Sequence, residues 1–184
     1  MGLGLLRPDS ICAQSPVFEW ARQISVTSTA SIVRCGDLAV DPPGDCVAFG
    51  DFDGTAAFGS TNVDSLSGHP AFIAKYNRAG LLRWAVPNGT AGLHQANGLA
   101  LDATAHCFIA GIVRSTNAGS AFDYFVGRLD GPGEQRWLER YGAENATSET
   151  AWNIAVDAQG TSFVVVSEGG FVSIKRFDPD ATAT

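Results

Sequence analysis

The sequence predicts an all-β protein assembled from a repeated unit of four short antiparallel strands, and three observations point to it. Apolar segments rich in Val, Ile, Phe and Trp are bounded by Gly, Pro, Asn and Asp, which is typical of strands joined by turns. No window keeps the apolar spacing of an amphipathic helix over three turns. The same order of segments recurs at intervals of roughly 50 to 65 residues, the range of repeat architectures.

The first two strands of the unit align in three copies. The first strand ends in Asp each time, at Leu38–Asp41, Leu99–Asp102 and Ile154–Asp157. A four-residue turn then leads into a second strand, which begins at Cys46, Cys107 and Ser162. This second strand is apolar at consecutive positions, as expected where both faces of a strand are buried. We therefore expect the units to stack face to face.

The third strand follows a loop of variable length, which is long at Gly50–Ala71 in the first copy. It aligns as Phe72–Asn77, Phe125–Asp130 and Ser173–Asp178. In two copies a turn and a Trp follow at the same offset, at Trp84 and Trp137. A four-stranded meander in each repeat is typical of a β-propeller blade. The sequence thus predicts β-propeller blades at 35–88, 96–142 and 151–184, the last without its outer strand.

Residues 17–26 hold Trp20 where a fourth strand would precede the next unit, so we expect an orphan outer strand there. Residues 1–16 are expected to be a poorly ordered tail. Because closed propellers have four to eight blades, three blades need completion. Two copies exchanging this strand head to tail would make a homodimer with a closed six-bladed ring. The alternatives are a fragment of a larger propeller, or unrecognised sequence that supplies part of a blade.

The order of motifs resembles the seven-bladed β-propeller (SBBP) repeats of bacterial proteins. The resemblance is carried by IAVD at 154–157, by the turn and apolar run, and by FVGRLD at 125–130 with its following Gly and Trp. Phe52–Gly59 resembles a loop common in those repeats, and Leu99–Leu129 is also similar to the related NHL propeller repeats. The resemblance implies the fold and a secreted or cell-surface protein, although no clear signal peptide is visible. It implies no particular function.

Composition and motifs argue against several classes of partner and chemistry. The net charge is −7 and no Lys/Arg run occurs, which argues against nucleic acid and anionic membrane. No apolar stretch approaches the roughly 18 residues of a membrane span. The three histidines lack zinc-ligand spacing, the four cysteines form no CxxC, and Asp51–Gly54 lacks the ligands of an EF-hand. We therefore predict no catalytic, metal or cofactor site.

The candidate binding residues lie on the rim that carries the variable loops, because insertions gathered on one face often mark the binding face of a repeat protein. They are Asp51, Asp53 and Asp123 on that rim, with Asp37, Asn97 and Asn153 where the innermost strands begin, near a central channel. The sequence predicts a non-enzymatic binding or scaffold module for a protein or glycan. The alternatives are a hydrolase or lyase with an acidic site at the channel mouth, and a fragment without independent function.

Overall fold

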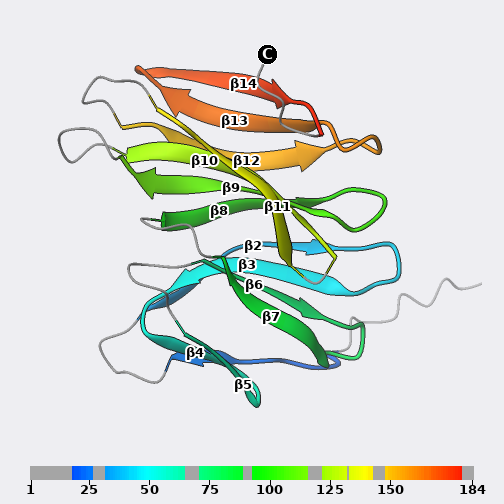
Figure 1. The fold of residues 1–184 in the computed structure, drawn as a ribbon. Helices are drawn as coiled ribbons and strands as arrows, with labels where there is room; N and C mark the ends of the chain where they lie inside the picture. The colour runs from blue at the N-terminus through cyan, green and yellow to red at the C-terminus, as the bar shows by residue number, and fades with distance from the viewer. Residues whose placement is uncertain are drawn as a thin grey trace, which may run out of the picture.

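The protein is an open stack of antiparallel β-sheets (Figure 1). A computed structural model describes residues 18–26, 32–64, 71–88, 93–115, 122–131, 133–142 and 148–179. These residues form fourteen strands in four sheets and contain no helix, which confirms the all-β prediction. No helix among them is therefore long and apolar enough to cross a membrane. The tail predicted at 1–16 lies outside the described residues.

Each repeat copy folds into one sheet whose strands follow one another in chain order from one edge, with the hairpin β4–β5 inserted between β3 and β6. The first sheet contains β2 (Val33–Val40), β3 (Cys46–Phe52), β6 (Ala71–Tyr76) and β7 (Leu82–Asn88). The second sheet contains β8 (Leu93–Leu101), β9 (Cys107–Arg114), β10 (Phe122–Asp130) and β11 (Glu134–Tyr141). The third sheet contains β12 (Thr150–Val156), β13 (Ser162–Glu168) and β14 (Phe171–Phe177).

The repeated Asp at the end of each first strand shapes the turn that follows it. Its Oδ1 atom accepts the backbone N–H four residues on, from Asp45 to Asp41 at 2.8 Å, from His106 to Asp102 at 3.0 Å, and from Thr161 to Asp157 at 2.9 Å. An Asp that binds the backbone ahead of it favours a turn over continued strand. The turn fixes the register of each hairpin, and with it the face on which each apolar side chain lies.

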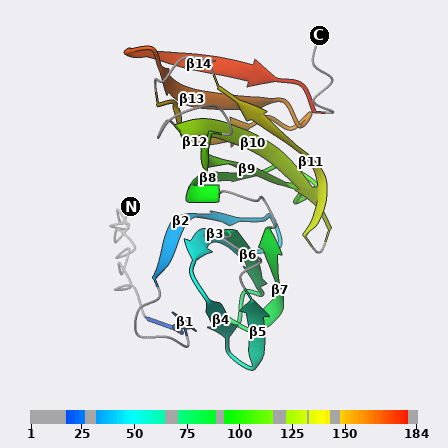
Figure 2. The ribbon, with the colours of Figure 1, turned by 60° about the vertical axis from the view of Figure 1, so that its left-hand side comes forward.

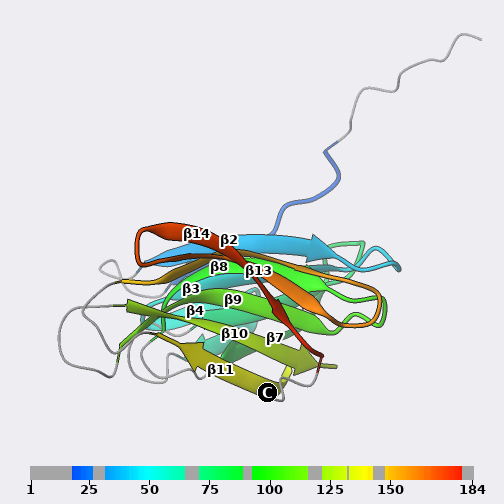
Figure 3. The same cartoon turned by 90° about the horizontal axis from the view of Figure 1, so that it is seen from above.

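The three sheets lie over one another in chain order, with apolar side chains filling the space between them (Figures 1 and 2). We call the face toward the next sheet along the chain the trailing face and the opposite one the leading face. The first interface packs Val47, Phe49 and Ile73 against Leu99, Ile109 and Phe125. The second packs Phe108, Tyr124 and Val126 against Ile154, Val164 and Val166. Seen from above, the sheets overlie one another (Figure 3).

A small fourth sheet covers the leading face of the first sheet, and we call it the cap sheet. It contains β1 (Ile24–Val26), β4 (Thr55–Phe58) and β5 (Thr61–Asp64). Its Phe58 ring meets Phe72 of β6 edge to face, with the ring centroids 5.1 Å apart. The sequence predicts only a loop over Gly50–Ala71, whereas part of that segment is the hairpin β4–β5. Its two four-residue strands are too short to give a clear alternating pattern.

The sequence predicts an outer strand over 17–26. In the structure the backbone of this segment differs from that of an outer strand, but its Trp20 makes the contact that the Trp of an outer strand makes. Residues 18–23 are not in a strand, and β1 pairs with β4 of the cap sheet. Trp20 Nε1 nevertheless donates to the carbonyl of Arg78 at 3.1 Å, as Trp137 Nε1 donates to Pro179 at 3.0 Å. Both acceptors follow the Asn or Asp that ends a third strand. Trp20 thus contacts the first sheet as Trp137 contacts the third.

Candidate functional site

A β-bulge occurs at the same repeat position in the first strand of each of the three sheets. The pairing of β2 with β3 skips Gly36, that of β8 with β9 skips Asn97, and that of β12 with β13 skips Trp152. A bulge leaves one residue outside the ladder and redirects its side chain. Because β2, β8 and β12 are neighbours in the stack, the three bulges lie along one edge of the molecule.

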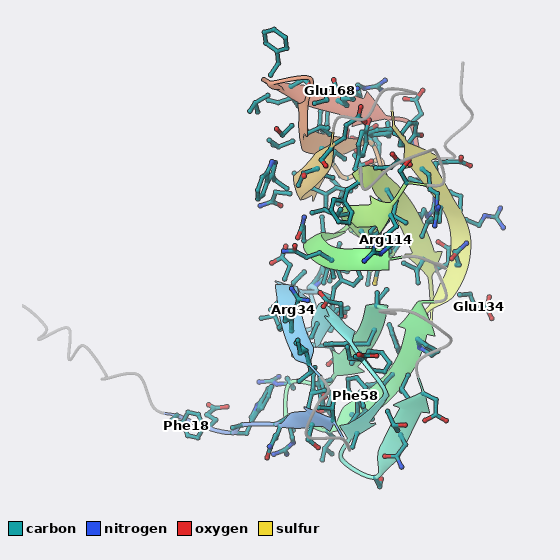
Figure 4. The ribbon with its side chains drawn as sticks, turned by 90° about the vertical axis from the view of Figure 1, so that its left-hand side faces the viewer. Phe18, Arg34, Phe58, Arg114, Glu134 and Glu168 are labelled. Carbon is teal, nitrogen blue, oxygen red and sulfur yellow. The ribbon has the colours of Figure 1, made fainter. Side chains whose placement is uncertain are left out.

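The bulges surround a small open groove of about 230 Å³, which we call the bulge groove. Its lining is Arg34, Cys35, Gly36, Asp51, Gln95, Ala96, Asn97 and Trp152. All three sheets therefore contribute to one surface, where polar side chains lie beside Ala96 and the Trp152 ring. That ring is 57% exposed. Figure 4 shows Arg34 on β2, near the level where the first sheet meets the second.

The charge in the groove is balanced by a buried partner. Arg34 Nε lies 3.1 Å from Asp51 Oδ2, and the Asp51 side chain is almost fully buried whereas that of Arg34 is half exposed. Asp51 Oδ1 also accepts the backbone N–H of Ala96 at 3.3 Å. A buried carboxylate that is both paired and hydrogen-bonded is compensated for its loss of water. Asp51 thus anchors the guanidinium group of Arg34 at the groove and ties β3 to β8.

Two more of the predicted residues connect neighbouring sheets. Asp37 uses both carboxylate oxygens on backbone amides, at 2.8 Å from Leu38 N and 2.9 Å from Leu99 N. Asn97 Nδ2 donates to the carbonyl of Ala151 at 2.6 Å. The bond from Leu99 to Asp37 and the bond from Asn97 to Ala151 each join one first strand to the next. The bond from Leu38 to Asp37 is local. Asp37 and Asn97 therefore hold the first strands of neighbouring sheets together at the edge of the groove.

The other three predicted residues lie apart from the groove lining. Asn153 Oδ1 accepts the N–H of Ile154 at 2.7 Å, and this residue lies on the trailing face of the third sheet. Asp53 is in the bend after β3, where its backbone N–H donates to Ile32 at 2.9 Å. Asp123 is on β10, paired across the ladder with Val113. The structure therefore brings Asp51 and Asn97 together in the groove lining. Asp37 directly follows Gly36, which is also part of that lining.

Gln95 is among the polar residues that the sequence places on the rim with the variable loops, whereas Arg34 and Trp152 were missed. Arg34 lies in a strand where alternation alone gives no sign of a shared groove. The available signal was the alignment of Gly36, Asn97 and Trp152, three different residue types at one otherwise regular repeat position. Such a break in an apolar repeat is typical of a bulge.

The groove also holds a thiol, Cys35, which is exposed. Partial burial and then the charge of Asp37 raise the pKa of this thiol above its ordinary value. A raised pKa keeps the thiol protonated near neutral pH and makes it a poor nucleophile. Among the described residues, no group of three or more His, Cys, Asp or Glu side chains is placed to hold a metal ion.

Comparison with known proteins gives this site no precedent. No protein-family model matches the chain, and no curated protein matches its sequence.

Proposed function

We propose that the three repeat sheets are successive blades of a β-propeller of the SBBP type, and that the chain is a non-enzymatic binding module. The proposal rests on how regularly the sheets stack. Each first strand carries its bulge at the same position, and Asn97 at one bulge and Asp37 beside another bind the next first strand. First strands side by side at one edge are what the inner wall of a propeller requires.

We assign the bulge groove as the ligand site, and the exposed Trp152 ring beside polar side chains carries this assignment. A Trp ring offers a flat apolar face, and its N–H is a donor. Gln95 and Asn97 offer amide groups, and Arg34 offers guanidinium N–H groups. A sugar presents C–H groups on its ring faces and hydroxyl groups around its rim, so this mixture suits a glycan better than an apolar ligand. A groove of about 230 Å³ suits a single sugar unit.

A hydrolase or lyase is less well supported than a binding module. General acid–base hydrolysis of a glycoside needs two carboxyl groups placed on either side of the bond that breaks. The acids nearest the groove, Asp37 and Asp51, already accept backbone amides, and Asp51 also pairs with Arg34. The described groove therefore offers groups that hold a ligand rather than groups that cleave it.

Saturation-transfer NMR against a panel of neutral and acidic oligosaccharides would test this function. We expect binding by the unmodified chain and a loss of about tenfold or more in affinity for Trp152→Ala, which corresponds to about 1.4 kcal/mol. Phe171→Ala is the matched control, because Phe171 is an exposed aromatic side chain that does not line the groove. If no sugar in the panel binds, or if Trp152→Ala binds as well as the unmodified chain, the glycan assignment is wrong. A peptide ligand would then be sought at the same groove.

A further inference from the structure

The trailing face of the third sheet is apolar and uncovered, and we call it the open face. Its side chains alternate along the three strands, and the cross-strand register places them together. They are Asn153, Ala155, Phe163, Val165, Val172, Ile174 and Arg176. Ile174 and Val172 are each 73% exposed. Exposed β-branched residues in a row on one sheet face are unusual on a soluble surface and point to an interface.

The repeat shows what normally covers these positions. Phe163 and Ile174 of the third sheet correspond to Val47 and Ile73 of the first sheet and to Phe108 and Val126 of the second. In the first two sheets these positions are buried by the following sheet. The third sheet keeps the same apolar character without that cover among the described residues. Its open face is thus shaped to pack against another β-sheet face.

A second copy of the chain is the occupant that the charges favour. The protein has a net charge of −7, yet the charged side chain on the open face, Arg176, is paired with Asp178 at 2.8 Å. Two such faces would meet without uncompensated like charges in contact, which would otherwise oppose association. The acidic side chain of Glu168 points to the opposite face, where it binds Lys175 at 2.6 Å.

The cap sheet, at the opposite end of the stack from the open face, restricts how two copies can pair. In a head-to-tail dimer, the open face of one copy would meet the leading face of the first sheet in the other. The cap sheet already covers that leading face over β3 and β6, where Leu38 and Val40 of β2 stay exposed. A head-to-tail contact would therefore have to displace the buried Phe58 and Val63 of the cap sheet. The open face of a second copy is the matching surface that remains.

We propose that the open faces of two copies pack against each other in a two-fold symmetric homodimer. A two-fold contact uses one patch twice and closes on itself. Both outer ends of the dimer are then cap sheets, so the assembly stops at two copies. It differs from the head-to-tail ring that the sequence suggested, because strands are not exchanged.

Light scattering on a size-exclusion column, over a range of concentrations, would test the dimer. We expect the unmodified chain to have twice the monomer mass of 19.3 kDa at high concentration. Ile174→Glu places a charge in the open face, so this variant should stay monomeric. Val40→Glu is the matched control, since Val40 is an equally exposed apolar strand residue on the opposite end of the stack. It should still dimerise. Circular dichroism would show that both variants remain folded.

Each alternative gives a different result. If the unmodified chain stays monomeric, forms larger assemblies or aggregates, the two-fold dimer is wrong. A dimer that survives Ile174→Glu would also overturn it. In a head-to-tail dimer, Ile174→Glu and Val40→Glu would each abolish association alone, and an equal mixture of the two would restore it, because each variant keeps the face that the other lacks. Restored association in the mixture would show that the copies pair head to tail and that the two-fold geometry is wrong.

Discussion

The two ends of the stack carry the same kind of repeat sheet but end in different ways. At one end the cap sheet, made partly from an insertion between β3 and β6, buries the leading face of the first sheet. At the other end the trailing face of the third sheet is exposed. Figure 4 shows Phe58 of the cap sheet and Glu168 of the third sheet near these opposite ends. A repeat sheet needs cover on both faces, and terminal units must supply it in a different way from internal ones.

Replacing one Phe at each end should show the largest difference. Phe58→Ala removes a ring that is 1% exposed, and Phe163→Ala removes one that is 39% exposed. We expect Phe58→Ala to lower the free energy of unfolding by about 3–5 kcal/mol, as for other buried Phe positions. In dilute solution Phe163→Ala should cost about 1 kcal/mol or less. Urea unfolding followed by circular dichroism would measure both.

This comparison also reports on the dimer. If the open face pairs with a second copy, the cost of Phe163→Ala will rise with protein concentration, since association stabilises the folded state. The cost of Phe58→Ala will not. Equal costs for the two variants at low concentration would mean that the two ends are covered alike.

The bulge position offers a second comparison between the first sheet and the third. A Cβ at Gly36 would collide with the backbone carbonyl of Ala96 on β8, which is fixed in its own ladder. The corresponding Trp152 lies in the last of the three repeat sheets and is 57% exposed. We expect Gly36→Ala to cost about 1–3 kcal/mol, because crowding in a packed site forces the backbone to shift. Trp152→Ala should change stability by about 0.5 kcal/mol or less, as is usual at the surface. Thermal unfolding of the two variants would check this, and a harmless Gly36→Ala would show that β2 and β8 can separate.

The elements that occur in every copy were predictable because the copies support one another. Asp41, Asp102 and Asp157 mark the same turn three times, and the apolar runs after them form the central strands of the sheets. The contact of Trp20 could also be predicted, since it matches the contact made by Trp137. The backbone of residues 18–26 could not be predicted, because β1 pairs with the inserted hairpin, which has no second copy for comparison.

The candidate site could be predicted only in part, because bulges interrupt the regular pattern of the strands. The sequence places Asp51 on the rim with the variable loops and Asn97 where a first strand begins, and the structure brings both to the groove. Arg34 and Trp152 reach it through bulges, and a bulge shifts the register by one residue. Period-two alternation therefore assigns the side chains beyond a bulge to the wrong face. Asp53 and Asp123, which the sequence places on the same rim as Asp51, lie outside the groove lining.

The smallest difference should come from two ion pairs on the third strands, because Lys75 and Arg176 hold the same repeat position. Lys75 Nζ lies 2.7 Å from Asp41 in a largely buried pair, and Arg176 lies 2.8 Å from Asp178 in an exposed one. Burial raises the pKa of Asp41, but hydrogen bonds from Lys75 and the Asp45 backbone outweigh it, so the pKa is lowered overall. An exposed pair contributes little.

A lowered folded-state pKa sets the sign of the pH dependence. The stabilisation by Asp41 is fully present above its unfolded-state pKa of about 3.9 and is lost as the pH falls through the lower folded-state value. Asp41→Asn should therefore cost about 1–2 kcal/mol at neutral pH and progressively less in acid. Asp178→Asn should cost about 0.5 kcal/mol or less throughout. Urea titrations of both variants from neutral pH to below pH 4 would measure this. A cost for Asp41→Asn that stayed constant into acid would mean that the covered sheet gains no more from its ion pair than the open one.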